Sequence, residues 1–148
     1  MARTQVPAEV RFALHDNLFA YAWALDRADA DGVAATFTRD GSITGFAGKK
    51  LTGAAGIKEF ATGAFNNQPG FKGRQHHVQP LFIEPAGNGW KMTSYWMAVT
   101  WDAGRSPTIL SMGYYQDTCE EQDGEWLFKE KIILPWDNQA APTVGPST

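Results

Sequence analysis

The chain has 148 residues, of which 43% are hydrophobic and 20% are charged, a composition typical of one globular domain with a sizeable core. Its formal net charge is -3 and it has no lysine or arginine cluster, so we expect no nucleic-acid partner. The sequence begins without the apolar segment of a signal peptide and has no run long enough to span a membrane, so we expect a cytoplasmic protein with no membrane partner.

The first predicted element is a helix over residues 8–25, a stretch that contains no Gly or Pro. One side of this helix, which we expect to face inward, carries four residues at helical spacing: His15, Phe19, Ala22 or Trp23, and Asp26. Leucines and Tyr21 form a second apolar stripe, which predicts a helix buried over most of its circumference.

Asp26 is an acid at the end of this apolar helix. Its charge opposes the helix dipole, which costs up to about 1 kcal/mol, and Asp29 already supplies the predicted N-cap of the next helix. A carboxylate that lowers stability and caps nothing indicates a functional role. From the residues alone, a solvated helix end beside Arg27 explains Asp26 equally well.

Two shorter helices, one turn and one short strand follow in the chain. The helices are predicted over residues 30–37 and 54–65, and between them a turn at residues 39–41 precedes a strand over residues 42–46.

Beyond Gly73 the pattern changes from helical to extended. Runs rich in β-branched and aromatic residues predict four strands, over residues 75–83, 90–101, 108–119 and 126–134. Turn sequences separate the strands, so we expect an antiparallel meander and, with the helices before it, an α+β domain. We assign residues 1–136 to this single domain and residues 137–148 to a polar C-terminal tail.

The strand over residues 90–101 is apolar on both faces. Met92 and Trp96 lie on one face, whereas Tyr95, Met97 and Trp101 lie on the other. A sheet with one face in water would alternate more cleanly. We therefore expect one face to cover the helices and the other to meet a second copy of the chain, in a homo-oligomer that is a dimer or a trimer.

The sequence contains no P-loop, dinucleotide fingerprint, nucleophile elbow or H-E-x-x-H motif, so no cofactor is predicted. The single cysteine, Cys119, excludes an internal disulfide and a cysteine-rich metal site. The spacing of His15, Asp26 and His76 is not diagnostic of metal ligands, and no metal is predicted.

Two motifs carry a family resemblance: Tyr21-x3-Leu25-Asp26-x2-Asp29-x-Asp31-Gly32-x4-Phe37-x2-Asp40-Gly41 and Asp123-Gly124-x-Trp126-x-Phe128. With the element order they resemble the SnoaL-like branch of the nuclear transport factor 2 (NTF2-like) superfamily, over about residues 8–134. The resemblance implies a cone in which three N-terminal helices pack on a curved, mostly antiparallel sheet and enclose a pocket. Such folds host dehydratases, isomerases, dehydrochlorinases, epoxide hydrolases and structural subunits.

The resemblance also implies catalytic residues. In the scytalone dehydratase and dehydrochlorinase branches, an aspartate at the position of Asp26 pairs with a histidine eight residues before a strand-ending glutamate. Counting back from Glu84 gives His76. In the ketosteroid isomerases, a tyrosine at the position of Tyr21 donates a hydrogen bond to the substrate oxygen. Their proton-shuttling aspartate falls at Gly45, which argues against isomerisation by that acid.

This sequence departs from the dehydratase pattern at other positions. The tyrosine pair of the dehydratases falls at Leu25 and Gly45, and a basic residue of the last strand falls at Ile132. The identity of the substrate is therefore not carried over from the resemblance.

The chemistry of an aspartate–histidine pair suits proton transfer. A neutral imidazole removes a proton, and a buried carboxylate fixes its tautomer. His76 and His77 are adjacent in a strand, so their side chains point to opposite faces and only one can meet Asp26. Hydrophobic alternation does not choose between them, and the resemblance selects His76. Alternatively, one histidine lies at an interface and the other is a hydrogen-bonded core residue.

We predict a cofactor-independent lyase that removes water from a small hydrophobic, aromatic, hydroxylated substrate, or cleaves it by a retro-aldol step. Asp26 and His76 form the acid/base dyad, and Tyr21 binds the oxygen that leaves or develops charge. The predicted substrate-binding residues are Trp23, Trp96, Trp101, Tyr115, His15 and Phe46. The alternatives are an isomerase with the same dyad, a non-catalytic ligand carrier, and a subunit similar to the β subunits of ring-hydroxylating dioxygenases.

Overall fold

The computed structural model describes residues 5–66, 74–101 and 106–136, so the predicted tail over residues 137–148 lies outside the described residues. The described helices are α1 (Ala8–Asp26), α2 (Ala30–Ala35) and α3 (Gly53–Asn66). The described strands are β1 (Phe37–Thr44), β2 (Lys50–Thr52), β3 (Gln75–Ala86), β4 (Gly89–Trp101), β5 (Pro107–Gln122) and β6 (Glu125–Pro135).

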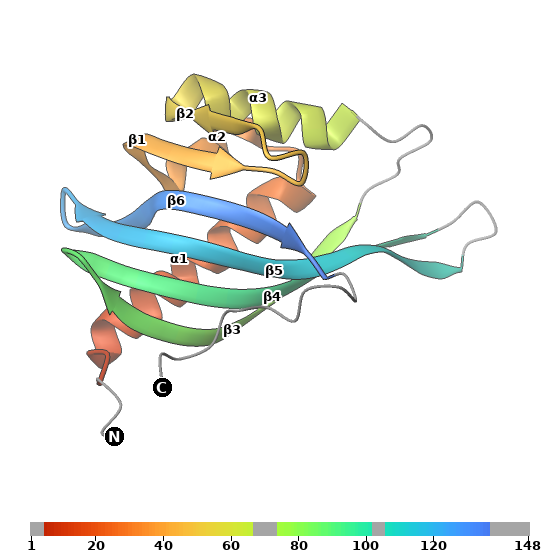
Figure 1. Cartoon of the computed structure of the whole chain (residues 1–148). Coiled ribbons are helices and arrows are strands. Elements are labelled where there is room, and N and C mark those ends of the chain that lie inside the picture. The colour runs from red at the N-terminus through yellow and green to blue at the C-terminus, as the bar shows by residue number, and fades with distance from the viewer. Residues whose placement is uncertain (1–4, 67–73, 102–105, 137–148) are drawn as a thin grey trace.

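The strands form one mixed sheet in the order β2-β1-β6-β5-β4-β3 (Figure 1). Strands β3 to β6 are the antiparallel meander that the alternating sequence predicted. The β1–β2 hairpin joins this meander through a parallel pairing of β1 with β6. The predicted α+β class, with helices first and a mostly antiparallel sheet after them, is confirmed.

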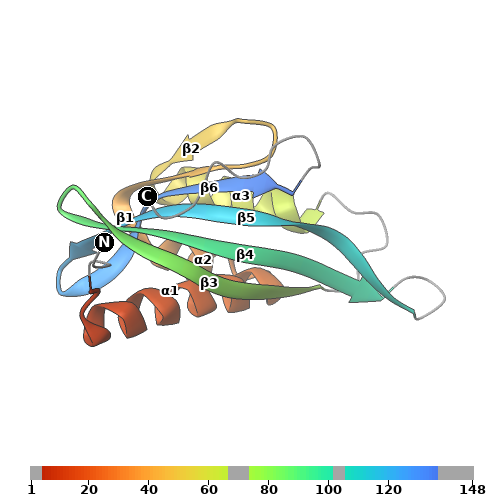
Figure 2. The ribbon, with the colours of Figure 1, turned by 60° about the horizontal axis from the view of Figure 1, so that its bottom comes forward.

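The helices pack on the sheet to enclose the core. Helix α1 contacts β3 and β6, and α3 contacts β1 and β2 at the other end of the sheet (Figures 1 and 2). The inward side of α1 is the stripe of leucines and Tyr21, all of which are nearly inaccessible to solvent. In the other stripe the predicted inward orientation is wrong for Phe19 and Trp23, which are 47% and 63% exposed, whereas the Asp26 side chain at its end is only 15% exposed.

The start of β1 differs from the prediction. Phe37 was expected to end the second helix, with a turn at residues 39–41, but Phe37 begins β1 and those residues lie inside the strand. The Phe37 ring is buried and packs edge-on against Phe128, with 5.4 Å between ring centroids. This burial outweighs the local turn preference of Asp40-Gly41, and the strand accommodates it by a register shift between Phe37 and Ser42.

Strand β3 is longer than predicted and lies at one edge of the sheet. It continues through Pro85, which was expected to start a turn, and it also contains Pro80. A proline has no N–H to donate to a neighbouring strand, so it is tolerated where one side of the strand has no partner. The pairing of β3 with β4 shifts register between Pro80 and Phe82.

Asp29 is the N-cap of α2, as predicted, and its side chain accepts a hydrogen bond from the Gly32 N–H at 2.8 Å. We expect Asp29→Ala to lower the free energy of unfolding by about 1 kcal/mol, because an N–H of the first turn loses its acceptor. Urea denaturation would measure this loss. Asp31→Ala is the matched control, because Asp31 is an exposed acid of the same turn, paired with Lys58, and its removal should change stability by less than about 0.5 kcal/mol.

The sheet face opposite the helices exposes large apolar side chains. Tyr95, Met112 and Trp136 are 41%, 46% and 44% exposed, and they surround a surface hollow of about 670 Å³. This face is the one from which a homo-oligomer was predicted, and that assembly stays a prediction. Within the described parts of the chain, the helices are too short or too polar to cross a membrane.

Candidate active site

A cavity of about 510 Å³ opens between the helices and the covered face of the sheet. Its volume lies within the range of ligand pockets in proteins. The lining is mostly apolar and comes from α1, α3, β2, the β1–β2 connection, the four long strands and the residue before β3: Tyr21, Leu25, Gly45, Phe46, Ala47, Lys49, Leu51, Glu59, Phe60, Gly63, Ala64, Arg74, His76, Trp96, Ala98, Leu110, Ser111, Tyr115 and Ile133.

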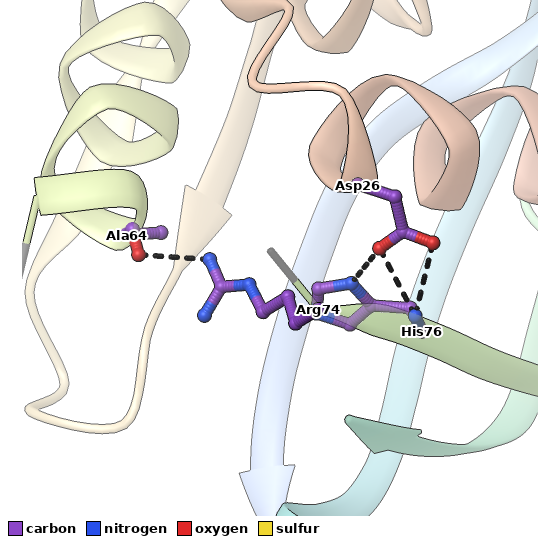
Figure 3. Close-up of polar contacts among 4 residues, drawn as sticks. All are labelled: Asp26, Ala64, Arg74 and His76. Carbon is purple, nitrogen blue, oxygen red and sulfur yellow. Dashed lines mark hydrogen bonds and ion pairs between the residues drawn. The ribbon is translucent and has the colours of Figure 1, made fainter. Parts of the chain in front are cut away.

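Asp26 and His76 meet at one wall of this cavity. Asp26 is the last residue of α1, and His76 is the second residue of β3 (Figure 3). The Asp26 Oδ1 atom lies 2.7 Å from His76 Nδ1. The backbone N–H of His76 also donates to the carboxylate, at 3.0 Å to Oδ1 and 3.1 Å to Oδ2. The same carboxylate therefore fixes both the main chain and the imidazole of His76.

This contact determines which nitrogen of the imidazole can act on a ligand. A carboxylate accepts hydrogen bonds, so the short contact assigns the proton to Nδ1 and leaves the lone pair of a neutral ring on Nε2. The side chains of His76 and Asp26 are only 7% and 15% exposed, so bulk water screens the pair weakly. His76 lines the cavity, which makes Nε2 a candidate base.

The neighbouring His77 lies on the opposite face of β3. Its side chain lines the hollow on the outer face of the sheet, and the residue is exposed. Alternation along the strand thus separates the two histidines, and the structure brings His76 to Asp26.

Tyr21 lies in the cavity wall and is fully buried. Within the described residues, its hydroxyl has no hydrogen-bond partner. Burial raises the pKa of the Tyr21 phenol, and the negative charge of Asp117 raises this pKa further. The hydroxyl is therefore protonated at neutral pH and has a hydrogen bond to give, which suits it to bind a ligand oxygen.

One wall of the cavity is aromatic and consists of Trp96, Tyr115 and Phe46. All three were predicted to bind substrate. Trp96 stacks on Tyr115 with 5.7 Å between centroids and an interplanar angle of 11°. Phe46 lies 5.4 Å from Trp96 and is 54% exposed, which places it at the mouth. The buried Trp96 Nε1 has no hydrogen-bond partner within the described residues. This wall matches the flat shape of an aromatic ligand.

The three other residues predicted to bind substrate lie outside the cavity lining. Trp23 is exposed on the outer side of α1, where the guanidinium carbon of Arg27 lies 5.5 Å from the centroid of its ring. His15 is on the same outer stripe, 6.3 Å from the Phe19 ring, and partial burial lowers its pKa. Trp101 is 66% exposed at the end of β4. The error for Trp23 and His15 follows from the helix face that was taken as inward.

Sequence reasoning did not single out Arg74, which also lines the cavity. Arg74 directly precedes β3, and its Nη2 donates to the carbonyl of Ala64 in α3 at 2.8 Å (Figure 3). A signal was present in the sequence, because a residue two positions before His76 shares its face of an extended chain.

A buried ion pair was missed as well. Lys131 Nζ lies 2.8 and 2.9 Å from the carboxylate oxygens of Asp117, and both side chains are 0% exposed. The ammonium lies over three aromatic rings, at 3.9 Å from Tyr115, 4.2 Å from Phe128 and 4.4 Å from Tyr21. Burial raises the pKa of Asp117 and lowers that of Lys131, whereas their mutual attraction opposes both shifts. The pair lies directly behind the two tyrosines of the cavity wall.

Comparison with solved structures shows the fold. The chain is similar to Rv3472(D26N), a protein of unknown function from Mycobacterium tuberculosis, with a TM-score of 0.76 and 23% identity. The match covers 92% of this chain and 82% of that one. An NTF2-like protein with a cystatin-like fold from Novosphingobium aromaticivorans gives a TM-score of 0.77 at 16% identity, over 90% of this chain and 86% of that one. A candidate scytalone dehydratase from the same species gives a TM-score of 0.69 at 23% identity, over 93% of this chain and 95% of that one.

Curated protein sequences gave no significant match. The family model of the SnoaL-like domain matches residues 7–131, which include α1, the whole sheet up to Lys131 and every residue of the cavity wall except Ile133. The fold is NTF2-like, as the resemblance implied. The chain belongs to the SnoaL-like domain family.

Proposed function

We propose that this chain is a cofactor-independent lyase that removes water from a small hydroxylated aromatic substrate. The contact of 2.7 Å between His76 Nδ1 and Asp26 Oδ1, at the wall of an apolar cavity, carries this proposal. An imidazole held in one orientation by a carboxylate is suited to general acid–base catalysis, which needs a base at a fixed position beside the substrate. The likeness in fold to a candidate scytalone dehydratase is consistent with it.

The proposed reaction begins with a proton transfer from a substrate carbon to His76 Nε2. Asp26 stabilises the imidazolium that forms, because its negative charge lies next to the protonated ring. The imidazolium then returns a proton to the departing hydroxyl group, which leaves as water. Tyr21 donates its hydroxyl hydrogen to an oxygen of the substrate. A retro-aldol cleavage uses the same base for a different proton. His76 Nε2 takes the proton of the substrate hydroxyl group, that oxygen becomes a carbonyl as the carbon–carbon bond breaks, and the imidazolium returns the proton to the carbon that leaves.

The cavity wall supports an aromatic substrate that carries oxygen atoms. The stacked rings of Trp96 and Tyr115 offer a flat apolar surface. Two buried donors, the Tyr21 hydroxyl and Trp96 Nε1, have no acceptor within the described residues. Buried polar groups are normally hydrogen-bonded, so a bound oxygen atom would complete this site.

The alternatives differ in the geometry that they need. An isomerase with the same dyad shares the geometry of the proposed lyase and is distinguished from it by its product. An isomerase of the ketosteroid type needs a carboxylate at the position of Gly45, which lines the cavity without one. The carboxylate that does line the described cavity, Glu59, pairs with Lys49 at 2.8 Å and is 61% exposed. A ligand carrier needs no contact between Asp26 and His76, so their short contact favours an enzyme.

NMR of the imidazole nitrogens tests the dyad. In the wild type we expect the His76 signals to show a proton held on Nδ1 by the hydrogen bond to Asp26, and Asp26→Asn to change these tautomer signals. The signals of His15 and His77 should be unaffected, because neither ring contacts Asp26 in the described part of the chain. If His76 shows no preferred tautomer and its signals ignore Asp26→Asn, the lyase has no oriented base and the carrier becomes the better proposal. A positive result justifies a screen of hydroxylated aromatic substrates.

A further inference from the structure

Arg74 brings a positive charge to the same cavity as the dyad. It lies two residues before His76, so the two side chains leave the same face of the extended chain. Residues at this spacing in a strand are about 7 Å apart along the backbone. The Arg74 side chain then extends toward the end of α3, where it reaches the Ala64 carbonyl (Figure 3).

Arg74 is a charged group in the wall of the cavity, and it is only partly accessible to solvent. Burial lowers the pKa of the guanidinium, and Asp26, Tyr21 and Tyr115 act in the opposite direction. A guanidinium stays protonated in proteins, so a fixed positive charge lies in a mostly apolar cavity. Water screens the other permanent cation of the described lining, Lys49, more strongly, because its side chain is 67% exposed.

We propose that Arg74 binds the carbonyl oxygen of the substrate as it becomes an enolate, and that the substrate is a β-hydroxy carbonyl compound with an aromatic ring. This inference rests on the proposed lyase function. A planar guanidinium suits a planar oxyanion, because its N–H groups form a rigid fork. A preorganised cation in a site with little water stabilises such developing charge.

The reaction then proceeds in two balanced steps. His76 Nε2 takes the proton from the carbon next to the carbonyl, and the C–H electron pair forms the carbon–carbon double bond of the enolate while the carbonyl oxygen becomes negative. In the second step the enolate reforms the carbonyl, a double bond forms toward the β carbon, and the β carbon–oxygen bond breaks. The imidazolium gives its proton to that hydroxyl group, so water leaves and the base is restored.

Binding of a stable mimic tests the role of Arg74 without turnover. A carboxylate resembles a planar enolate, so 2-naphthoate and its neutral isostere 2-naphthamide are suitable probes for isothermal titration calorimetry, at about pH 8 where carboxylates are ionised. We expect the wild type to bind the carboxylate about tenfold or more tightly than the amide, as is typical of a hydrogen bond to a charged group. Arg74→Met should abolish this preference.

The control is Arg27→Met, which removes the same charge from a residue that is exposed next to Asp26 and outside the cavity lining. This variant should keep the preference within about twofold, because a solvent-screened charge contributes little. Both probes should also be measured in His76→Gln, where a retained preference shows that the imidazolium is not its source. Arg74→Lys keeps the charge without the planar fork and should keep only part of the preference.

Two results would overturn the inference: a wild type that does not prefer the carboxylate, or a preference that survives in Arg74→Met. Arg74→Met loses the hydrogen bond to the Ala64 carbonyl and could fail to fold for that reason. In that case Arg74→Gln supplies the same test, because its amide N–H can donate a hydrogen bond but carries no charge. The dyad and the anion site can fail separately. If the carboxylate preference is intact but His76 shows no preferred tautomer, the result supports an anion-binding pocket without lyase activity. If the dyad is intact but the preference is absent, the role of Arg74 is rejected.

Discussion

Asp117→Ala is expected to lower the free energy of unfolding by about 3–5 kcal/mol, because it leaves the Lys131 ammonium buried without its counterion. Both side chains are inaccessible to solvent, and Lys131 Nζ lies 2.8 Å from Asp117 Oδ1. The rings of Tyr21 and Tyr115 stabilise the cation by their π faces, but they cannot replace a carboxylate. Denaturation by urea, followed by circular dichroism, would measure the loss.

The double variant Asp117→Leu/Lys131→Met distinguishes the loss of the whole ion pair from the burial of one unpaired charge. Two apolar side chains of similar size remove both desolvation costs at once, so we expect its stability to be close to that of the wild type. Lys131→Met alone should resemble Asp117→Ala, because it leaves the buried carboxylate unpaired. The control is Lys50→Met, whose partner Glu130 is on the surface, and it should change stability by less than about 1 kcal/mol. A double variant as unstable as the single ones would show that ion pairing is not the cause.

His76→Gln is expected to lower kcat by about 10²- to 10⁴-fold on the substrate that the screen identifies, because it removes the proposed base. Asp26→Asn should lower kcat as well, since the imidazole loses the group that fixes its tautomer and stabilises its charge. The two residues act as one unit, so the double variant should be little slower than the slower single variant. Steady-state kinetics would measure all three.

The control for this series is His77→Gln, which alters the neighbouring side chain on the outer face and should leave kcat within about twofold. Thermal unfolding should accompany the kinetics for Asp26→Asn, because the Asp26 carboxylate also accepts the backbone N–H of His76. If His76→Gln retains nearly all activity, the base is another group and the proposed mechanism is wrong.

The fold was predictable from the sequence because its elements follow simple periodicities. The change from helical to alternating patterns at Gly73 located the meander, and Asp29 marked the start of α2. The orientation of α1 was not predictable, because both of its stripes are apolar and only packing against β3 and β6 decides between them. That ambiguity placed Trp23 and His15 on the wrong side.

The site was predictable only in part. The Asp26–His76 pairing came from the family resemblance, and the structure brings the two residues together. The Lys131–Asp117 pair was hidden by a shift of register. The hairpin pairs Gln122 with Glu125, and an unbroken register from there would place Asp117 opposite Glu130. An irregularity between Thr118 and Cys119 moves the pairing by one residue, which sets Lys131 opposite Asp117 on the inner face.

The Asp26 carboxylate accepts hydrogen bonds from both the backbone and the imidazole of His76, so local unfolding at this contact also removes the orientation of the proposed base. Asp26 and His76 are 50 positions apart in the chain, and a single group both anchors the first residues of β3 and aligns the ring. Any partly opened state in which α1 detaches from β3 therefore loses the aligned imidazole while the β4–β6 ladder is still intact. The proposed proton transfer therefore requires the fully assembled molecule, because Asp26 no longer orients His76 in the partly opened state.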